Sequence, residues 1–480
     1  MSHITKVPKL RKPGSANVGV FVPYKEKREK VLDTCKFPRE RPDNWREIAL
    51  NTFRDILSKF RSVKLFLDTC VHCGACADKC HYFLGTGDPM NMPVARAELM
   101  RKVYKRYFTP AGKLGAGAEL NEEMLDKWYT YFHQCSECRR CSVFCPYGID
   151  TAEITIAART ILGSIGYASK YVAEVIDKCH RIGNNLGINP QALKDSCEFL
   201  EEEIEEETGL SIKIPIDVEG AEVLLINPSA DYFGNPHTDA TVGYAKVFYK
   251  AGISWTISTY ASEGGNFGMF TNYYHLKKIN KRMVDAAKAL KVKKMVMGEC
   301  GHAWRNAQAF TDTLNGPLDF LEKPRPQHIC EFTLDLIKKG ALKFDKSRND
   351  DVYITYHDPC NAARAGGIMD EPREIIKHVA NYFAEMPRNT IREYTFCCTG
   401  GGGVLADELK HLRALAAKPR IDAWRATRVD VNGEKKLPNY MATPCAICKA
   451  TWPHNFEYWK VDDKVRIGGV HDLVSKAIIL

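Results

Sequence analysis

The sequence predicts an α+β protein in which a helical, cysteine-rich domain is followed by two α/β repeats related by a pseudo-twofold axis. Two groups of four closely spaced cysteines lie within helical patterning, and short apolar strands alternate with helical segments beyond residue 221. The same order of landmarks then recurs from residue 352, which indicates a duplication. We expect five regions: a basic arm at 1–45, the helical domain at 46–197, an acidic linker at 198–220, and repeats at 221–340 and 341–480.

The composition is that of a globular protein that neither spans a membrane nor carries a secretory signal. The 480 residues are 45% hydrophobic and 26% charged, which is typical of a globular chain with several domains. No stretch has the length and apolarity of a membrane span, and the first thirty residues lack the apolar core of a secretory signal. Most of the 18 cysteines lie in short clusters, which favours reduced thiolates in the cytoplasm. Any connection to the cytoplasmic membrane must therefore come through a partner subunit.

Residues 1–45 are rich in Lys and Arg and show no helical or strand period. This pattern predicts an extended basic arm. Two interpretations stay open: a solvated tail, or an arm laid on a partner subunit or on anionic lipid head groups. The net charge of +9 is otherwise spread along the chain, and it gives no support to nucleic-acid binding.

Two cysteine motifs in the helical domain share the spacing Cys-x2-Cys-x2-Cys-x3-Cys, and Pro146 follows the second. In two-cluster ferredoxins the fourth cysteine of each such motif binds the other cluster. The short gaps let a tight turn wrap three thiolates around one cluster. A zinc site would need only four of the eight cysteines in the two motifs, so zinc is the less suitable metal. We therefore predict two [4Fe–4S] cubanes, one on Cys70, Cys73, Cys76 and Cys145 and the other on Cys135, Cys138, Cys141 and Cys80.

The linker at 198–220 begins with an acidic run, Glu198 to Gly209, that carries apolar residues at helical spacing. Gly209 stands where a helix C-cap is expected, so the run predicts an exposed boundary helix.

Beyond the linker, alternating strands and helices predict parallel, doubly wound sheets. Three landmarks align between the repeats: 223–229 with 354–360, 264–268 with 397–403, and 298–304 with 443–452. The gap between the last two landmarks is longer in the second repeat, which predicts an insertion near Val429 to Lys436. The first repeat has lost nearly all its cysteines.

The second repeat carries five cysteines that each follow a predicted strand or open a helix, where open α/β sheets bind ligands. They are Cys360, Cys397, Cys398, Cys445 and Cys448. Adjacent cysteines do not bind one iron comfortably but can bind different irons, so we predict a metal cluster that is not a simple cube. Gly400 and Gly401 remove side chains beside it and allow close approach of backbone or substrate. A vicinal disulfide or a structural zinc site are the alternatives.

Polar residues near these cysteines are further candidates. Cys300, beside His302, stands at a ligand-equivalent position of the first repeat, where a buried structural thiol is the alternative. His302, His357 and Asp358 could deliver protons to a leaving thiolate. Four other cysteines have no partners at ligand spacing and are predicted to be plain thiols: Cys35, Cys179, Cys197 and Cys330.

These motifs resemble a known family. Two ferredoxin motifs followed by the five cysteines are similar to the layout of the HdrD-type subunit of heterodisulfide reductases, with its cysteine-rich CCG domain. The resemblance covers roughly residues 60–480. One intact and one degenerate CCG repeat, and the run from Thr69 to His81, are most similar to the DsrK (HmeD) subunits of the Dsr (DsrMKJOP) membrane complexes.

The resemblance implies a noncubane [4Fe–4S] cluster on the five cysteines, where a disulfide or trisulfide is cleaved with electrons supplied one at a time. It implies a DsrM-like membrane cytochrome b partner that oxidises menaquinol, other Dsr subunits, and a trisulfide on a small DsrC-like sulfur carrier as substrate. Thr399 departs from the family pattern, in which glycine commonly follows the cysteine pair, and adds a side chain beside the cluster.

Two other functions stay open at this stage. One is the iron–sulfur subunit of a glycolate, lactate or glycerol-3-phosphate dehydrogenase, which passes electrons from a flavin partner; those relatives usually keep two fuller CCG repeats. The other is a non-catalytic electron relay or scaffold, which the gathering of five thiolates at one site does not favour.

Overall fold

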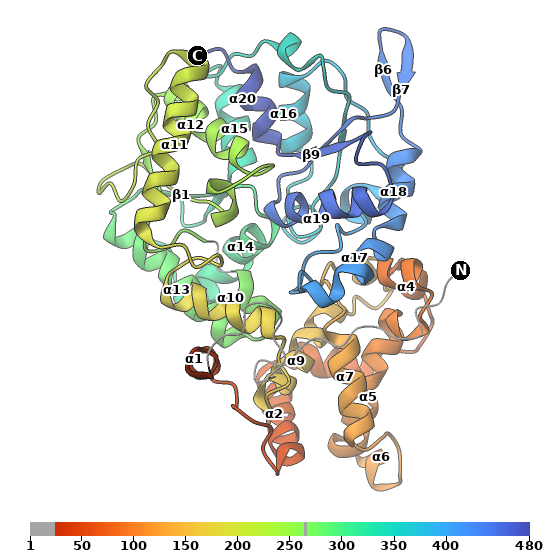
Figure 1. Ribbon diagram of the computed structural model, residues 1–480. Coiled ribbons are helices and arrows are strands. Elements are labelled where there is room, and N and C mark those ends of the chain that lie inside the picture. The colour runs from red at the N-terminus through yellow and green to blue at the C-terminus, as the bar shows by residue number, and fades with distance from the viewer. Residues whose placement is uncertain (1–24, 264–265) are drawn as a thin grey trace. The chain divides into compact units, whose positions relative to one another are not determined.

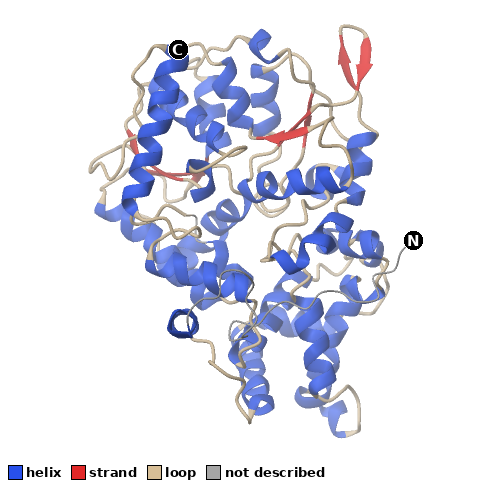
Figure 2. Ribbon diagram, in the orientation of Figure 1, coloured by secondary structure: helices blue, strands red, loops and turns tan. Residues whose placement is uncertain are grey.

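The computed structural model describes residues 25–263 and 266–480, which form two compact units (Figure 1). Unit 1 comprises the chain up to Asp177 together with Phe267–His275 and Thr399–Pro419. Unit 2 comprises Lys178–Asn266, Leu276–Cys398 and Arg420–Leu480. The fold is α+β, as predicted: helices form unit 1, and all described strands belong to unit 2 (Figure 2).

Part of the predicted basic arm, residues 1–24, lies outside the described residues, as do Gly264 and Gly265 of the first repeat. The rest of the arm begins with helix α1 (Lys25–Cys35). Within the part of the chain that the structure describes, no helix has the length and apolarity needed to cross a bilayer. The division into five regions inferred from the sequence stays a prediction.

The helices of unit 1 begin at residues that the sequence marks clearly. The Asp150 carboxylate caps α9, because it accepts the backbone N–H groups of Ala152 and Glu153. Proline opens α5 and α6, where its missing N–H is no loss. The apolar faces pack around Phe53, Trp128 and their neighbours. The helices are α2 (Trp45–Lys59), α3 (Arg61–Thr69), α4 (His81–Thr86), α5 (Pro93–Phe108), α6 (Pro110–Lys113), α7 (Glu122–Phe132), α8 (Arg140–Val143), α9 (Thr151–Ser164) and α17 (Lys410–Ala416).

The segment Thr399–Pro419 belongs to unit 1 although it is far away in the sequence. Its helix α17 packs against α4, and a Cβ at Gly85 of α4 would lie 2.3 Å from the Leu415 carbonyl oxygen. The Tyr82 hydroxyl donates to the Thr399 carbonyl oxygen at 2.7 Å. These contacts fix the start of the glycine run, directly after the cysteine pair, to the helical unit.

Unit 2 contains two small parallel sheets and one hairpin. The first sheet has the order β2-β1-β3-β4 and the second the order β5-β8-β9. The strands are β1 (Val223–Ile226), β2 (Trp255–Thr256), β3 (Lys294–Met297), β4 (Gln327–His328), β5 (Ile354–Tyr356), β6 (Val429–Val431), β7 (Glu434–Lys436), β8 (Tyr440–Ala442) and β9 (Arg466–Gly468). The hairpin β6–β7 is the predicted insertion, and its turn uses the positive φ angles of Asn432 and Gly433.

The two sheets repeat one topology, which confirms the predicted pseudo-twofold pair. β1, β3 and β4 correspond to β5, β8 and β9, and a parallel bridge from Ile354 to Phe383 takes the place of β2. The register is regular: Leu224 pairs with Met295 in the first sheet, and Thr355 with Met441 in the second. α12 of the first repeat packs against α20 of the second, and α15 against α16 (Figure 1). The two repeats therefore share one hydrophobic core.

The remaining helices flank these strands. They are α10 (Lys170–Arg181), which spans the boundary between the units, α11 (Pro190–Thr208), α12 (Thr238–Ala251), α13 (Tyr273–Ala289), α14 (Gly301–Asn315), α15 (Ile329–Lys338), α16 (Glu371–Val379), α18 (Lys418–Arg425), α19 (Ala446–Tyr458) and α20 (Val470–Ala477).

The acidic segment is the second half of α11, and Gly209 adopts the left-handed conformation expected of a C-cap, with φ 69°. The helix is not wholly exposed, because Cys197, Leu200 and Ile204 are buried in the core of unit 2. The sequence boundary at 197/198 thus falls inside one continuous helix.

A close backbone approach in unit 1 gives the first prediction. Gly402 has φ +60°, and a Cβ there would lie 2.8 Å from the Cys135 carbonyl oxygen. Gly402→Ala should lower the free energy of unfolding by about 2–4 kcal/mol, because strain at positive φ adds to overpacking. Gly433→Ala is the matched control, since its φ is +88° but nothing lies within 4 Å of the added Cβ. Urea unfolding should show that the control loses no more than about 1–2 kcal/mol of its free energy of unfolding. Equal losses in the two variants would contradict the close approach at Gly402.

Candidate metal centres

The first cysteine group lies around a small hollow in unit 1. Its lining includes Cys70, Cys73, Cys76 and Cys145, so the fourth cysteine of the second motif joins three of the first. Cys141 of the second motif lines it as well. Burial, with the nearby Cys145 and Cys70 thiols, raises the pKa of the Cys76 thiol. Cys73 is exposed, whereas the other three are half-buried.

The second group gathers the other four cysteines. Burial raises the pKa of the Cys141 thiol well above its ordinary value, and the neighbouring thiols of Cys138, Cys135 and Cys80 add to the rise. The structure thus brings the eight cysteines together in the crossed pattern expected from the sequence. Crowded, buried thiols favour the thiolate form only when a cation is bound, so this donor set fits metal clusters. The role of each cysteine as a ligand stays a prediction.

The two motifs share an unusual backbone conformation. His72 and Glu137, each two residues after the first cysteine of its motif, have φ 57° and 55°. Gly74 and Arg139, four residues after it, have φ 78° and 61°. Non-glycine residues rarely adopt positive φ. These repeated left-handed turns wrap each motif tightly, and the Glu137 N–H donates to the Cys135 Sγ at 3.4 Å.

A buried arginine holds the second motif in place. Arg159 pairs with Glu137 at 2.8 Å, and both side chains are buried. It also donates to the carbonyl oxygens of Cys135 at 2.7 Å and Gly402 at 2.6 Å. Arg159 therefore links α9, the second motif and the glycine run. Sequence reasoning missed this residue, because it lies far from any cysteine along the chain.

The five cysteines of the second repeat converge in unit 2. Cys360 Sγ lies 3.9 Å from Cys397 Sγ, and Cys448 is hydrogen-bonded to both Cys398 and Cys445. All five are buried. Cys360 follows β5, and Cys445 is the N-cap of α19, so they lie beyond the carboxyl ends of parallel strands, as predicted.

Cys300 and His302 lie at the same site. Cys300 is the N-cap of α14, as Cys445 is of α19, and burial and the nearby Cys445 raise the pKa of the Cys300 thiol. Hydrogen bonds from Cys448 and His302 hold the pKa of Cys445 well below its usual value. The pseudo-twofold thus brings the one cysteine that the first repeat keeps at a ligand-equivalent position to the cluster site.

The three candidate proton donors differ in their surroundings. His302 Nε2 lies 2.9 Å from Asn361 Nδ2, and His357 Nε2 lies 3.5 Å from Cys448 Sγ. Burial lowers the pKa of His357 to about 3, so its ring is neutral. Asp358 instead forms a bidentate ion pair with Arg373, at 2.7 and 2.8 Å, so its carboxylate has a structural role.

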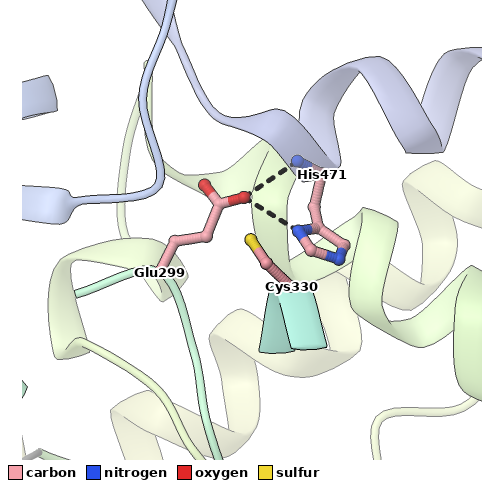
Figure 3. A group of neighbouring side chains, drawn as sticks. All are labelled: Glu299, Cys330 and His471. Atoms are coloured by element: carbon pink, nitrogen blue, oxygen red, sulfur yellow. Dashed lines mark hydrogen bonds and ion pairs between the residues drawn. The ribbon is translucent and has the colours of Figure 1, made fainter. Parts of the chain in front are cut away.

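Cys330, predicted to be a plain thiol, lies beside Glu299 and His471 (Figure 3). Glu299 Oε1 accepts the His471 backbone N–H at 2.9 Å and is 2.8 Å from its ring Nδ1. The other ring nitrogen, Nε2, is 2.7 Å from the Thr333 hydroxyl. Since both ring nitrogens have partners, we interpret the Glu299–His471 pair as a clasp between the repeats. Cys35, Cys179 and Cys197 are buried.

A second polar contact joins the first repeat to the cluster-bearing helix α19. Lys449 follows Cys448 directly, and its ammonium lies 3.3 Å from the Asp231 carboxylate, with both side chains fully buried. Burial works against the Lys449 charge, but nearby carboxylates, above all Asp231, raise its pKa, so it stays protonated. His237 Nε2 lies 3.1 Å from the Ala446 carbonyl oxygen. The degenerate repeat therefore holds the segment that carries Cys445 and Cys448; adjacency to those cysteines was the signal that could have revealed Lys449.

Comparisons with known proteins agree with this organisation. Residues 66–149 match the 4Fe–4S dicluster domain family, and residues 354–452 match the cysteine-rich CCG domain family. The chain is 45% identical to the "Hdr-like menaquinol oxidoreductase iron-sulfur subunit 2" of Archaeoglobus fulgidus, over 92% of this chain and 84% of that protein. The chain belongs to the Hdr-like family of iron–sulfur subunits. The two domain families therefore indicate iron–sulfur clusters in this chain.

More distant relatives show how widely the Hdr-like layout occurs. The HdrD-type subunit of the dihydromethanophenazine:CoB–CoM heterodisulfide reductase of Methanosarcina mazei is 28% identical over 86% of this chain and 94% of its own length. The EtfAB:quinone oxidoreductase of Syntrophomonas wolfei is 22% identical over 86% of this chain and 58% of its own length. The predicted likeness to HdrD is confirmed, and the finer likeness to DsrK stays a prediction.

The buried Asp231–Lys449 pair gives the second prediction. Asp231→Asn should lower the free energy of unfolding by about 3–5 kcal/mol, because it removes the carboxylate that is paired with the buried Lys449 ammonium. Asp231→Asn combined with Lys449→Met should recover most of this loss. Thermal unfolding of the cluster-loaded protein measures both. If the double variant is as unstable as the single one, the charge pair is not the cause.

Proposed function

We propose that the chain is the iron–sulfur subunit of a membrane-associated respiratory complex and reduces a disulfide or trisulfide bond. Electrons would come from a quinol-oxidising, DsrM-like cytochrome b partner and pass through two cubanes to a noncubane [4Fe–4S] cluster. The observation that carries the proposal is the convergence of the five cysteines of the second repeat, with Cys300, in one buried site. A plain electron relay needs no third set of thiols beyond the eight of the dicluster domain.

The relatives support both ends of this path. One is named a menaquinol oxidoreductase subunit, and another a subunit of a heterodisulfide reductase. A quinol at one end implies membrane partners, such as other Dsr-like subunits, and a peripheral position on the cytoplasmic face. We propose a trisulfide on a DsrC-like carrier protein as the substrate, in dissimilatory sulfur metabolism.

We propose Cys360, Cys397, Cys398, Cys445 and Cys448 as ligands of the noncubane cluster. When bound, that cluster would supply single electrons and a binding position for sulfur. Breaking one S–S bond consumes two electrons and two protons: a disulfide RS–SR′ becomes RSH and R′SH, and a trisulfide RS–S–SR′ becomes RSH and the hydropersulfide R′S–SH.

The chain's own residues position the reaction. His302 interacts with Cys445, and its Nε2 lies 2.9 Å from Asn361 Nδ2, so its ring is held beside the thiol group, where it would deliver a proton. His357, kept neutral by burial, lies against Cys448. Gly400 and Gly401, which follow the cysteine pair in the chain, are buried and leave room for backbone or substrate.

The test is anaerobic iron quantification with electron paramagnetic resonance (EPR) of the purified full chain. We expect about twelve irons, for three four-iron clusters, and an oxidised-state signal that changes on adding a thiol or a persulfurated carrier protein. Cys398→Ser should abolish that signal and disulfide reduction, whereas Cys197→Ser, at a buried thiol of α11, should keep both. About eight irons and no thiol-dependent signal would overturn the catalytic proposal and leave a two-cubane relay.

A further inference from the structure

Helix α5 carries a buried arginine in its first turn. Arg96 is 1% exposed, and among the described residues no carboxylate forms an ion pair with it. Two other buried arginines near the motifs differ in this respect: Arg101 pairs with Glu98 at 2.6 Å, and Arg159 pairs with Glu137 at 2.8 Å. A third, Arg140 of the second motif, donates to the Lys79 carbonyl oxygen at 3.0 Å. A buried guanidinium without a counter-charge is strongly unfavourable, so its partner must be something other than a side-chain carboxylate.

The contacts of Arg96 point to the second cysteine group. Its Nη2 donates to the side-chain oxygen of Asn91 at 3.1 Å, whereas its buried Nε has no hydrogen-bond partner in the described part of the chain. The guanidinium charge lies close enough to the Cys80 and Cys135 thiols to lower the pKa of each, although burial raises both. Burial works against its charge, but Cys135, Cys80 and Cys141 raise its pKa above the ordinary value. Three thiols predicted to hold one cubane therefore lie near this cation.

The position in the helix adds to the argument. Arg96 lies near the N-terminus of α5, which begins at Pro93, and the positive end of the helix dipole disfavours a cation there. The Val94 N–H in the same turn donates to the Cys76 thiol and lowers its pKa, which burial otherwise raises. The first turn of α5 thus interacts with both cysteine groups. Its Val94 N–H dipole acts on the first group, and its Arg96 charge acts on the second.

We propose that Arg96 is the counter-charge of the cubane held by Cys135, Cys138, Cys141 and Cys80, and that it raises the reduction potential of that cubane above that of the other. A four-iron cluster on four thiolates is anionic and gains a further negative charge on reduction, so a fixed cation stabilises the reduced form. The inference rests on the proposed ligand assignment.

Among the described residues that line the first hollow, no arginine or lysine lacks a carboxylate partner. Arg101 lines this hollow, but the Glu98 carboxylate at 2.6 Å neutralises it, and its Nε donates to the Leu67 carbonyl oxygen. This asymmetry sets a direction: at equilibrium an electron favours the Arg96 side. Arg96 acts as a positioning residue through the cluster and touches no substrate.

The test is an EPR-monitored redox titration of the full, cluster-loaded chain. Arg96→Met should lower the equilibrium constant for reduction of the second cubane at least tenfold, which is about 59 mV for one electron. The equilibrium constant of the first cubane should change by less than threefold. Arg96→Lys keeps the charge and should restore most of the potential. The two signals are assigned with Cys73→Ser, which removes a proposed ligand of the first cubane only.

The matched control removes a buried cation together with its anion: Glu98→Gln combined with Arg101→Gln should shift neither potential by more than threefold. An unchanged potential in Arg96→Met at full iron content would overturn the proposal. Equal shifts in the Met and Lys variants would also overturn it, because they would show that side-chain packing, and not charge, sets the potential. If Arg96→Met loses the second cubane while Arg96→Lys keeps it, the counter-charge role is supported; loss from both overturns it. The readout involves the cubanes alone, so failure here is distinct from failure of the disulfide chemistry.

Discussion

The close packing of cysteine thiols inside the protein is the constraint on which the rest of the structure depends. Thiols crowded together and shielded from water repel one another once deprotonated, and only bound metal relieves that repulsion. The chain meets this constraint in two ways. Left-handed turns shape each of the two ferredoxin-type motifs, and helix N-termini direct backbone N–H groups or thiols toward the cysteine groups. Cys300 and Cys445 both serve as N-caps, so one structural device is used in each repeat.

Buried ion pairs also help to hold the cysteine-bearing segments in place. Arg159 with Glu137, Arg373 with Asp358, and Lys449 with Asp231 all place ion pairs in the interior near a cysteine group. Buried pairs add little net stability, but breaking one is strongly unfavourable, so they fix a unique geometry. This explains why the loops that carry the cysteines can be nearly free of regular structure and still hold their positions.

The sequence predicted those parts of the fold and site that depend on local patterns. Cysteine spacing predicted the two crossed groups, strand–helix alternation predicted the repeats, and unequal spacing predicted the hairpin at 429–436. It could not predict contacts that depend on the folded chain. The joining of 399–419 to the helical unit rests on Tyr82 and on the close approach of Gly402, and the clasp of Glu299 with His471 spans 172 positions. No local pattern encodes such pairs.

The degenerate repeat shows how a duplicated segment can lose one kind of chemistry and keep another. It lost most of the ligand-position thiols but kept Asp231, His237 and Glu299, each of which contacts the second repeat. A gene shortened to the cysteine-bearing repeat would encode every proposed noncubane ligand, yet its product would expose one face of the shared core and leave Lys449 without its partner. Protein engineers who seek a minimal version of this centre must therefore keep the half that holds no cluster.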